Sequence, residues 1–482
     1  MEEFTLEFSK FYQGYSPVAH INSLAELGNG GQAGAMVEAD ILDPTHITQG
    51  PGVANLTNGT QAGAVSELIN MIMDRAVASD ATYGIGATKL FKLSSTTVVS
   101  DATWPQAITS CTDGESVVEL KGNLYYFFNK SSGGEIGKFD LASTFDHDWG
   151  STVPTGAAAL QKAPHPVEVK EDIMVFGNGR YLGVYLADDN KLSPTKLDFG
   201  NNNEVADVVF YNNHWLVAVN VGVSGSNRNQ GQIYLYDGAA LSSLLSDETA
   251  VGVQRIGFLF VKNGIVFVAY QDLSFSGGFK IGYISGKQIK DLGYFTGALP
   301  NFAQKTLYKN VILFVSSDKI LAGGAVIEEL PFAMSQLADG GYATIGALAA
   351  PFGTPMVAST DGGSNHRLAQ FSGFSIASTW RSIIVPVIKG RKLGFIDKII
   401  VLTKNLATGA SCSLKIEANQ AQSTSSGMTI TTASKRRFVF TSKDIGLGKI
   451  EDLRIFLDWS GGSASADCAI RKIIINGHYV GA

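Results

Sequence analysis

The chain has 482 residues, a length that suggests about three domains of ~150 residues each, or fewer if one is a large repeat array. Charged residues make up only 17% of it, against a typical ~25%, and its 54 glycines exceed the usual share of ~7%. This composition is typical of tightly turned β structure or of surfaces buried in an assembly. The formal net charge of −6, with no basic stripe, argues against binding nucleic acid through its phosphates.

The sequence shows no signal for export, for a membrane span or for a disulfide framework. Residues 1–8 are acidic where a secretory signal is basic, and no apolar run approaches the ~18 residues of a membrane span. Cys111, Cys412 and Cys468 are odd in number and form no C-x-x-C pair, so we expect them to act as small buried hydrophobic residues. We expect the protein to be made in a cytoplasm.

Residues 1–80 differ from the rest of the chain, because they hold many Gly, Asn and Gln residues and little strand periodicity. We expect an extended N-terminal arm there, which finds its hydrogen-bond partners on the rest of the molecule and on an adjacent subunit. Its one expected regular element is a helix over residues 62–78, where apolar residues recur at steps of three and four: Val65, Leu68, Ile69, Ile72, Met73 and Val77. The segment Asp40–Thr57 is dense in Pro and Gly, which specify a defined but non-repetitive path.

Residues 81–378 repeat one short β unit with glycine or polar turns between its strands. In the clearest copy, Glu204–Gly238, the apolar run Val205–Phe210 meets a turn and two further strands. Related units lie at Val117–Leu141, Val167–Leu186, Ile256–Ile284, Ala303–Ile327 and Ala343–Phe374, with a weaker one at Tyr83–Val99. Three or four strands every ~35–50 residues are typical of propeller blades, so we expect a β-propeller of about six or seven blades. A pair of packed β-sandwiches is the alternative.

Residues 379–482 show a different strand pattern, with most of the alternating Thr and Ser. The expected strands are Phe395–Thr403, Ser411–Ala418, Met428–Thr432, Phe438–Thr441, Leu453–Trp459 and Asp467–Ile475. About six antiparallel strands in ~95 residues suit a jelly-roll-like β-sandwich. We therefore expect a separate C-terminal domain.

Four short motifs in and just after the arm carry a resemblance to a known family: Gly14–Pro17, Asp43–Pro44, Thr48–Gly52 and Thr82–Gly86. Followed by a β-propeller, they resemble virion proteins of tailed bacteriophages, mainly over residues 1–110. The resemblance implies a tail or tail-connector component that is made in the host cytoplasm. It also implies assembly into the virion with other virion proteins and with copies of the same chain. It brings no catalytic role, cofactor or metal with it.

Two motifs are candidates for chemistry, and each has a structural interpretation. Ser359–Gly363 matches the S-x-D-x-G core of the Asp-box turn of sialidase propellers, which closes a β-hairpin and is not catalytic. No spacing indicates the converging arginines and tyrosine nucleophile of a sialidase. Asp146, His147 and Asp148 offer two carboxylates and an imidazole, but Trp149 follows where a calcium loop continues with oxygen ligands, which favours an exposed loop. We assign no catalytic, cofactor-binding or metal-binding residue.

Three classes of function fit these observations. A structural virion protein is favoured, since it accounts for the sparse charge, the arm and the resemblance together. The alternative is a receptor- or glycan-binding module at the tail tip, with aromatic residues such as Phe275, Tyr294 and Phe295 in its loops. A glycan-cleaving propeller ranks third, and it requires paired carboxylates ~5 Å or ~6.5–9.5 Å apart in the central channel. We expect no enzyme, no nucleic-acid partner and no membrane span.

Overall fold

The computed structural model of the chain describes residues 2–9, 33–37, 39–40, 47–49, 51–58, 61–62, 65–77, 81–222, 230–245, 253–272, 277–308, 311–324, 333–338, 342–375, 378–382, 384–420, 422–460 and 462–481. These residues form mostly strands and turns, which confirms the prediction of a mainly β protein. The helices within these ranges are single turns, α1 (Trp149–Thr152) and α2 (Ser442–Ile445). No helix in the described part of the chain has the length and apolar character needed to cross a bilayer.

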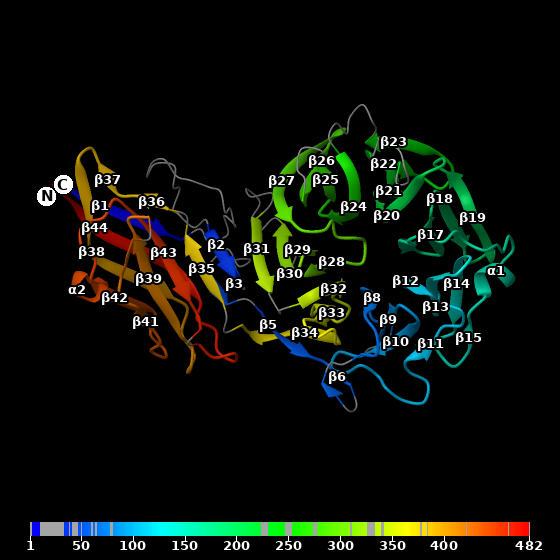
Figure 1. Cartoon of the computed structure of the whole chain (residues 1–482), viewed down its shortest axis with the longest axis horizontal. Helices are drawn as coiled ribbons and strands as arrows, with labels where there is room; N and C mark the ends of the chain where they lie inside the picture. Colours follow the sequence, from blue (N-terminus) through cyan, green and yellow to red (C-terminus); the bar gives the residue numbers. More distant parts are fainter. Residues whose placement is uncertain are drawn as a thin grey trace.

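Seven four-stranded antiparallel sheets, counted over the described residues, lie around a common centre in Figure 1, and we call them together the ring. The first three are β8 (Ile69–Ile72), β9 (Thr82–Gly86), β10 (Lys89–Leu93) and β11 (Gln106–Ala107); β12 (Asp113–Leu120), β13 (Asn123–Lys130), β14 (Gly133–Phe139) and β15 (Phe145–Asp146); and β16 (Val167–Lys170), β17 (Ile173–Asn178), β18 (Tyr181–Leu186) and β19 (Lys191–Asp198).

The fourth to seventh sheets continue in chain order, and only the last takes a strand from the N-terminal region. They are β20 (Asn203–Tyr211), β21 (His214–Val221), β22 (Gln230–Tyr236) and β23 (Leu241–Leu245); β24 (Val253–Lys262), β25 (Ile265–Asp272), β26 (Gly278–Ser285) and β27 (Gln288–Thr296); β28 (Lys305–Tyr308), β29 (Val311–Ser316), β30 (Lys319–Gly324) and β31 (Ala333–Ala338); and β32 (Tyr342–Ala349), β33 (Met356–Asp361), β34 (His366–Phe374) and β5 (Pro51–Asn55).

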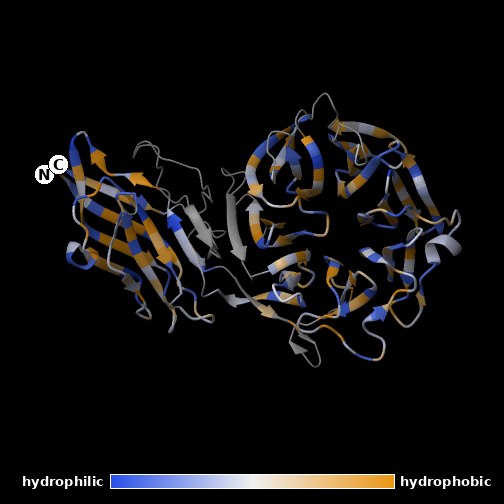
Figure 2. Ribbon diagram, in the orientation of Figure 1, coloured by the Kyte–Doolittle hydropathy of each residue, from blue (hydrophilic) through white to orange (hydrophobic). Residues whose placement is uncertain are grey.

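A cluster of buried hydrophobic side chains lies between each sheet and the next. Trp104 and Phe128 belong to the cluster between the first and second sheets, and Phe91 and Met356 to the cluster between the first and seventh. Because neighbouring sheets cover both of its faces, β13 is buried along nearly its whole length. Figure 2 shows hydrophobic residues alternating with hydrophilic ones along many of the strands.

The predicted helix over residues 62–78 is wrong: the described residues 65–77 form strand β8 flanked by bends. β8 pairs with β9, and its side chains enter two different clusters. Ile69 and Ile72 pack between the first and seventh sheets, whereas Met71 and Met73 pack between the first and second. Because both faces of the strand are covered, its apolar residues occur at steps that imitate a helical stripe.

The prediction of an arm over residues 1–80 is also wrong for the described parts of that region. β1 (Glu3–Phe8) pairs with β44 (Ile470–Gly481), β2 (Ala33–Val37) pairs with β35 (Thr379–Ser382), and β5 pairs with β34. Two short hairpins add β3 (Ala39–Asp40) with β4 (Thr48–Gln49), and β6 (Thr57–Asn58) with β7 (Gln61–Ala62). The backbone groups of these strands therefore find their partners in sheets of the same chain.

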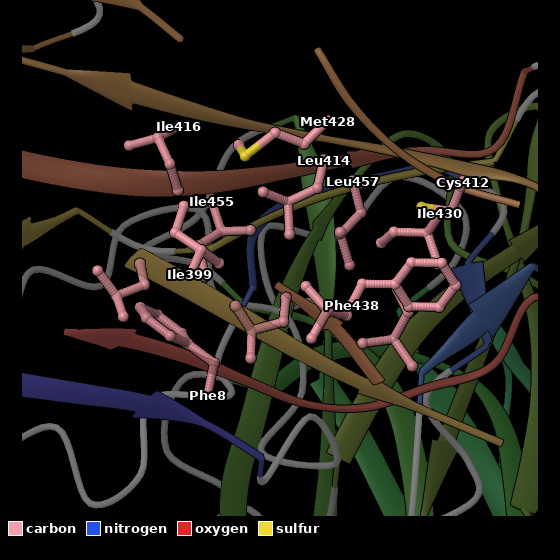
Figure 3. Close-up of a cluster of buried hydrophobic side chains, with 14 of the residues drawn as sticks. Phe8, Ile399, Cys412, Leu414, Ile416, Met428, Ile430, Phe438, Ile455 and Leu457 are labelled. Carbon is pink, nitrogen blue, oxygen red and sulfur yellow. The ribbon is translucent and has the colours of Figure 1, made fainter. Parts of the chain in front are cut away.

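The C-terminal region forms two packed antiparallel sheets, to which the N-terminal strands β1 and β2 belong. The first sheet is β1, β44, β38 (Lys392–Thr403), β37 (Ile388–Lys389) and β42 (Arg437–Thr441). The second is β2, β35, β43 (Asp452–Asp458), β39 (Cys412–Ala418), β40 (Ser423–Thr424), β36 (Val385–Pro386) and β41 (Met428–Ile430). Figure 3 shows Phe8 and Phe438 of the first sheet facing Leu414 and Leu457 of the second across one buried core.

The chain passes between these two sheets and the ring before β5 and again after β34, and the first passage is hydrogen-bonded both to β44 and to the second passage. Ile47 and Ile470 exchange two backbone hydrogen bonds of 2.8 Å. The side chain of Gln49, only 1% exposed, donates to the Ser375 carbonyl at 3.5 Å and accepts from the Cys468 N–H at 3.2 Å. β2 and β3 also lie beside β31 of the sixth sheet. The joint is therefore a packed contact and not a free linker.

Candidate binding cavity on the ring axis

A cavity of about 710 Å³ lies at the centre of the ring, where the first strands of several sheets begin. Its walls come from β8, β12, β20, β24 and β32, which surround the centre in Figure 1, and from the loop 298–304 between the fifth and sixth sheets. The volume falls in the range of about 300–1,000 Å³ that is usual for small-molecule sites.

A β-bulge interrupts each of these five strands at the cavity. At the cavity the ladder skips one residue in each strand: Asn70, Glu115, Ala206, Gly257 and Gly346. All five line the cavity. β24 and β32 each skip a second residue, Gln254 and Ala343, which lie outside the cavity lining. A bulge leaves one residue unpaired and re-aims its side chain, so the same local irregularity in five sheets directs five residues toward one space.

Carboxylates from two of the sheets give the cavity an acidic wall. Asp113 and Glu115 come from β12, and Glu204 comes from β20. Burial, together with the nearby charge of Asp113, raises the pKa of Glu115 to about 8, so this carboxyl holds a proton at neutral pH. Burial also raises the pKa of Asp113 and of Glu204.

Some of the polar side chains in this wall are held by hydrogen bonds within the protein, and others are not. Asn129 donates to Glu115 Oε1 at 2.6 Å, and Asn70 donates to Asp113 Oδ1 at 3.0 Å. Among the described residues, none forms a hydrogen bond with the side chains of Glu204, Arg255 or Gln271. The Arg255 guanidinium acts on Glu204 only through its charge, which lowers the pKa of Glu204 against the effect of burial.

A second cavity of about 300 Å³ shares Phe302 and Ala303 with the first and lies beside a buried ion pair. Asp207 from β20 is 3% exposed and pairs with Lys305 from β28. The Asp207 carboxylate also accepts the Leu259 N–H at 2.7 Å, and Lys305 Nζ donates to the Leu259 carbonyl at 2.5 Å. The pair thus connects the fourth, fifth and sixth sheets, which follow one another around the ring.

Two further carboxyls face this second cavity. Asp74, which follows β8, accepts hydrogen bonds from Thr306 Oγ1 at 2.8 Å and from the Ala350 N–H at 2.5 Å. Burial outweighs these bonds and raises the pKa of Asp74 to about 6. Burial likewise raises the pKa of Glu168 to about 7. Asp74 therefore connects the first sheet to the sixth and seventh through a group that titrates near neutral pH.

The Asp-box motif is a turn, as the sequence predicted. Asp361 ends β33, and its Oδ1 accepts the N–H groups of Gly363 at 2.9 Å and Asn365 at 3.0 Å. Arg367 Nε donates to Oδ2 at 2.8 Å. The Asn365 N–H and the other donors lower the pKa of Asp361 to about 2. His366 is bonded to Thr360 at 3.0 Å.

Asp146, His147 and Asp148 each engage a different partner. The His147 ring is 2.7 Å from the Tyr126 hydroxyl, and Lys130 Nζ pairs with Asp148 at 2.7 Å. Asp146 accepts the Asp148 N–H at 3.2 Å. Within the described ranges, no group of three His, Cys, Asp or Glu residues is arranged to hold a metal ion.

Of the aromatic residues proposed for a glycan-binding surface, the two that the structure describes differ in exposure. Phe295 is 6% exposed and stacks on Phe279 with ring centroids 5.2 Å apart. Tyr294 is 59% exposed, with Lys280 Nζ 4.8 Å from its ring centroid. Phe275 lies outside the described residues.

Sequence reasoning missed the residues that face the axis, although one of them carried a signal. Asp207 is a charged residue inside the apolar run Val205–Phe210, which indicates a buried, paired carboxylate. Asp113, Glu115 and Glu204 occur at strand starts, where polar residues are ordinary. Only the arrangement of the sheets brings them to one cavity.

No protein-family model matches the sequence, and no curated protein matches it. Among solved structures, the CNH domain of AfRom2 is similar at 11% identity and a TM-score of 0.43, covering 67% of this chain and 100% of that one. An ancestral GH74 enzyme is similar at 10% identity and a TM-score of 0.46, covering 68% of this chain and 51% of that one. The N-terminal domain of Nup159 is similar at 10% identity and a TM-score of 0.37, covering 66% of this chain and 100% of that one. These likenesses assign the chain to no family.

Proposed function

We propose that this chain is a structural protein of a tailed-bacteriophage virion, a tail or tail-connector component without enzymatic activity. In this proposal the ring is a closed seven-bladed β-propeller, and the two packed sheets are a jelly-roll-like sandwich. The observation that carries the proposal is that N-terminal strands complete sheets in both parts, β1 and β2 in the sandwich and β5 in the ring, so the chain joins the two parts at two places.

Closure of the propeller is supported by the junction of the first and seventh sheets. β5, which precedes the first sheet in sequence, completes the seventh sheet beside β34. Ile69 and Phe91 of the first sheet pack with Met356 and Leu368 of the seventh. A ring closed by a strand from its own start resists opening, since the last sheet cannot separate without breaking a ladder.

Rigidity at the joint supports a mechanical role. Gln49 lies in the first passage between sandwich and ring, and its bonds reach Ser375 in the second passage and Cys468 in the sandwich. Two hydrogen-bonded passages restrict bending far more than one flexible linker. A component of this kind holds its neighbours at a fixed spacing, as a tail assembly requires.

Mass spectrometry of purified particles of the phage that encodes this chain tests the proposal. We expect the chain in the tail fraction in several copies, together with other virion proteins. Particles from a strain lacking the gene should then show an incomplete tail. Complete, infectious particles that contain none of the chain would contradict the proposal, as would robust glycan cleavage by the purified protein.

A further inference from the structure

We infer that the 710 Å³ cavity on the ring axis is a binding site for a neutral oligosaccharide. This inference goes beyond a structural role in the virion, and it rests on the ring alone. Three features carry it: the bulges that form the cavity, the polar groups left without partners, and the balance of charge.

The bulges bring neighbouring segments close together in the wall of the cavity. At three of the five bulged positions the residue is Gly or Ala, namely Ala206, Gly257 and Gly346. A Cβ at Gly257 would lie 2.1 Å from the Pro300 carbonyl oxygen, and one at Gly346 would lie 2.4 Å from the Ile69 carbonyl oxygen. Small residues thus allow these strands to approach their neighbours closely, while Asn70 and Glu115 supply polar groups at the equivalent positions.

The hydrogen-bonding groups at the cavity suit a ligand with many hydroxyls. Glu204 is a free acceptor, Arg255 is a free donor, and the Gln271 amide is both, since no described residue bonds to these side chains. A hydroxyl both donates and accepts, so adjacent sugar hydroxyls pair with a carboxylate on one side and a guanidinium or amide on the other. Phe302 and Leu299 add apolar surface for the C–H face of a sugar ring.

The charge of the wall favours a neutral ligand over a charged one. Asp113 and Glu204 oppose an anion, whereas Arg255 opposes a cation, and Glu115 holds a proton at neutral pH. The described residues offer no three-ligand group for a metal. Neutral hydroxyls are repelled by neither the carboxylates nor the guanidinium, and they can still form hydrogen bonds with both.

The test uses the full-length chain on an array of neutral, acidic and amine-bearing oligosaccharides, followed by calorimetric titration with the best neutral ligand and with spermidine. Glu204→Ala and Arg255→Ala remove one polar partner each, and Ala298→Trp fills the cavity from an exposed position. Asp189→Asn, on an exposed turn outside the cavity, is the matched control. Thermal melting of each variant checks that it is folded.

We expect a neutral oligosaccharide to bind, with about a tenfold or larger loss of affinity in each cavity variant and none in Asp189→Asn. Binding of no neutral oligosaccharide on the array would overturn the inference. So would neutral binding that all three cavity variants retain, because the site would then lie elsewhere. Tight binding of spermidine alone would reassign the cavity to an organic cation.

Discussion

Replacing Lys305 by Met should be among the most damaging single changes in the ring, because it leaves a buried carboxylate without its cation. Asp207 is 3% exposed and pairs with Lys305, while its other hydrogen bonds come from the N–H groups of Val208 at 2.9 Å and Leu259 at 2.7 Å. Removing one partner of a buried pair costs about 3–5 kcal/mol. At about 2 °C per kcal/mol for a large domain, the melting temperature of the ring should fall by about 6–10 °C.

The double variant Asp207→Asn with Lys305→Met distinguishes the energy of the ion pair from the effect of changing the side chains around it. Burial raises the pKa of Asp207 despite Lys305, which means that desolvation outweighs the attraction between the two charges. Removing both charges should therefore restore most of the stability lost in Lys305→Met. Differential scanning calorimetry of the wild type, both single variants and the double variant completes the cycle. The reasoning is refuted if Lys305→Met melts within about 2 °C of the wild type, or if the double variant is no more stable than Lys305→Met.

Three other outcomes follow from the structure. Burial raises the folded-state pKa of Asp74 from 3.8 to about 6, that of Glu168 from 4.5 to about 7 and that of Glu115 from 4.5 to about 8. The contribution of these protonated carboxyls to the stability of the fold is therefore complete below pH ~4 and is lost as the pH rises through the folded-state values. The melting temperature should therefore be higher at pH 5 than at pH 8.5, and Asp74→Asn should weaken this dependence; a melting temperature that rises over this interval would contradict the assignment. A fragment of residues 379–482 should give poorly dispersed amide signals, because its sheets lack β1 and β2, and should gain dispersion when residues 1–40 are supplied. Asp361→Ala should destabilise the ring by about 1 kcal/mol in thermal melting through lost turn hydrogen bonds, without affecting oligosaccharide binding.

Local patterns in the sequence predict the repeat and its turns, because the strands of each sheet in the ring pair with their neighbours along the chain, apart from β5 with β34. The run Val205–Phe210 lies within β20, and the Asp361 turn joins β33 to β34 within a few residues. The strand β8 shows where local reading fails, since burial on both faces gave it a helix-like spacing. Periodicity records which side chains are buried, but it does not record what covers them.

Pairing between distant segments could not be predicted from the sequence. Phe8 lies opposite Ile473 in the ladder between β1 and β44, and no feature of residues 3–8 indicates a partner at the other end of the chain. The same holds for the axial cavity, because a bulge at Glu115 or at Gly346 follows from how strands pair and not from residue type alone. Both features depend on how distant strands come together in three dimensions, which the sequence does not state.

Cryo-electron microscopy of the tailed particle that carries this chain tests the central claim most directly. The account predicts tail density that fits the ring and the sandwich as one body, with Ile47 beside Ile470 at the joint and the same placement in every copy. Neighbouring subunits should contact the outer faces of this body and leave the strands β1, β2 and β5 in their own sheets. A tail whose density holds no copy of the chain would contradict the claim, and so would copies in which the ring and the sandwich take different relative orientations.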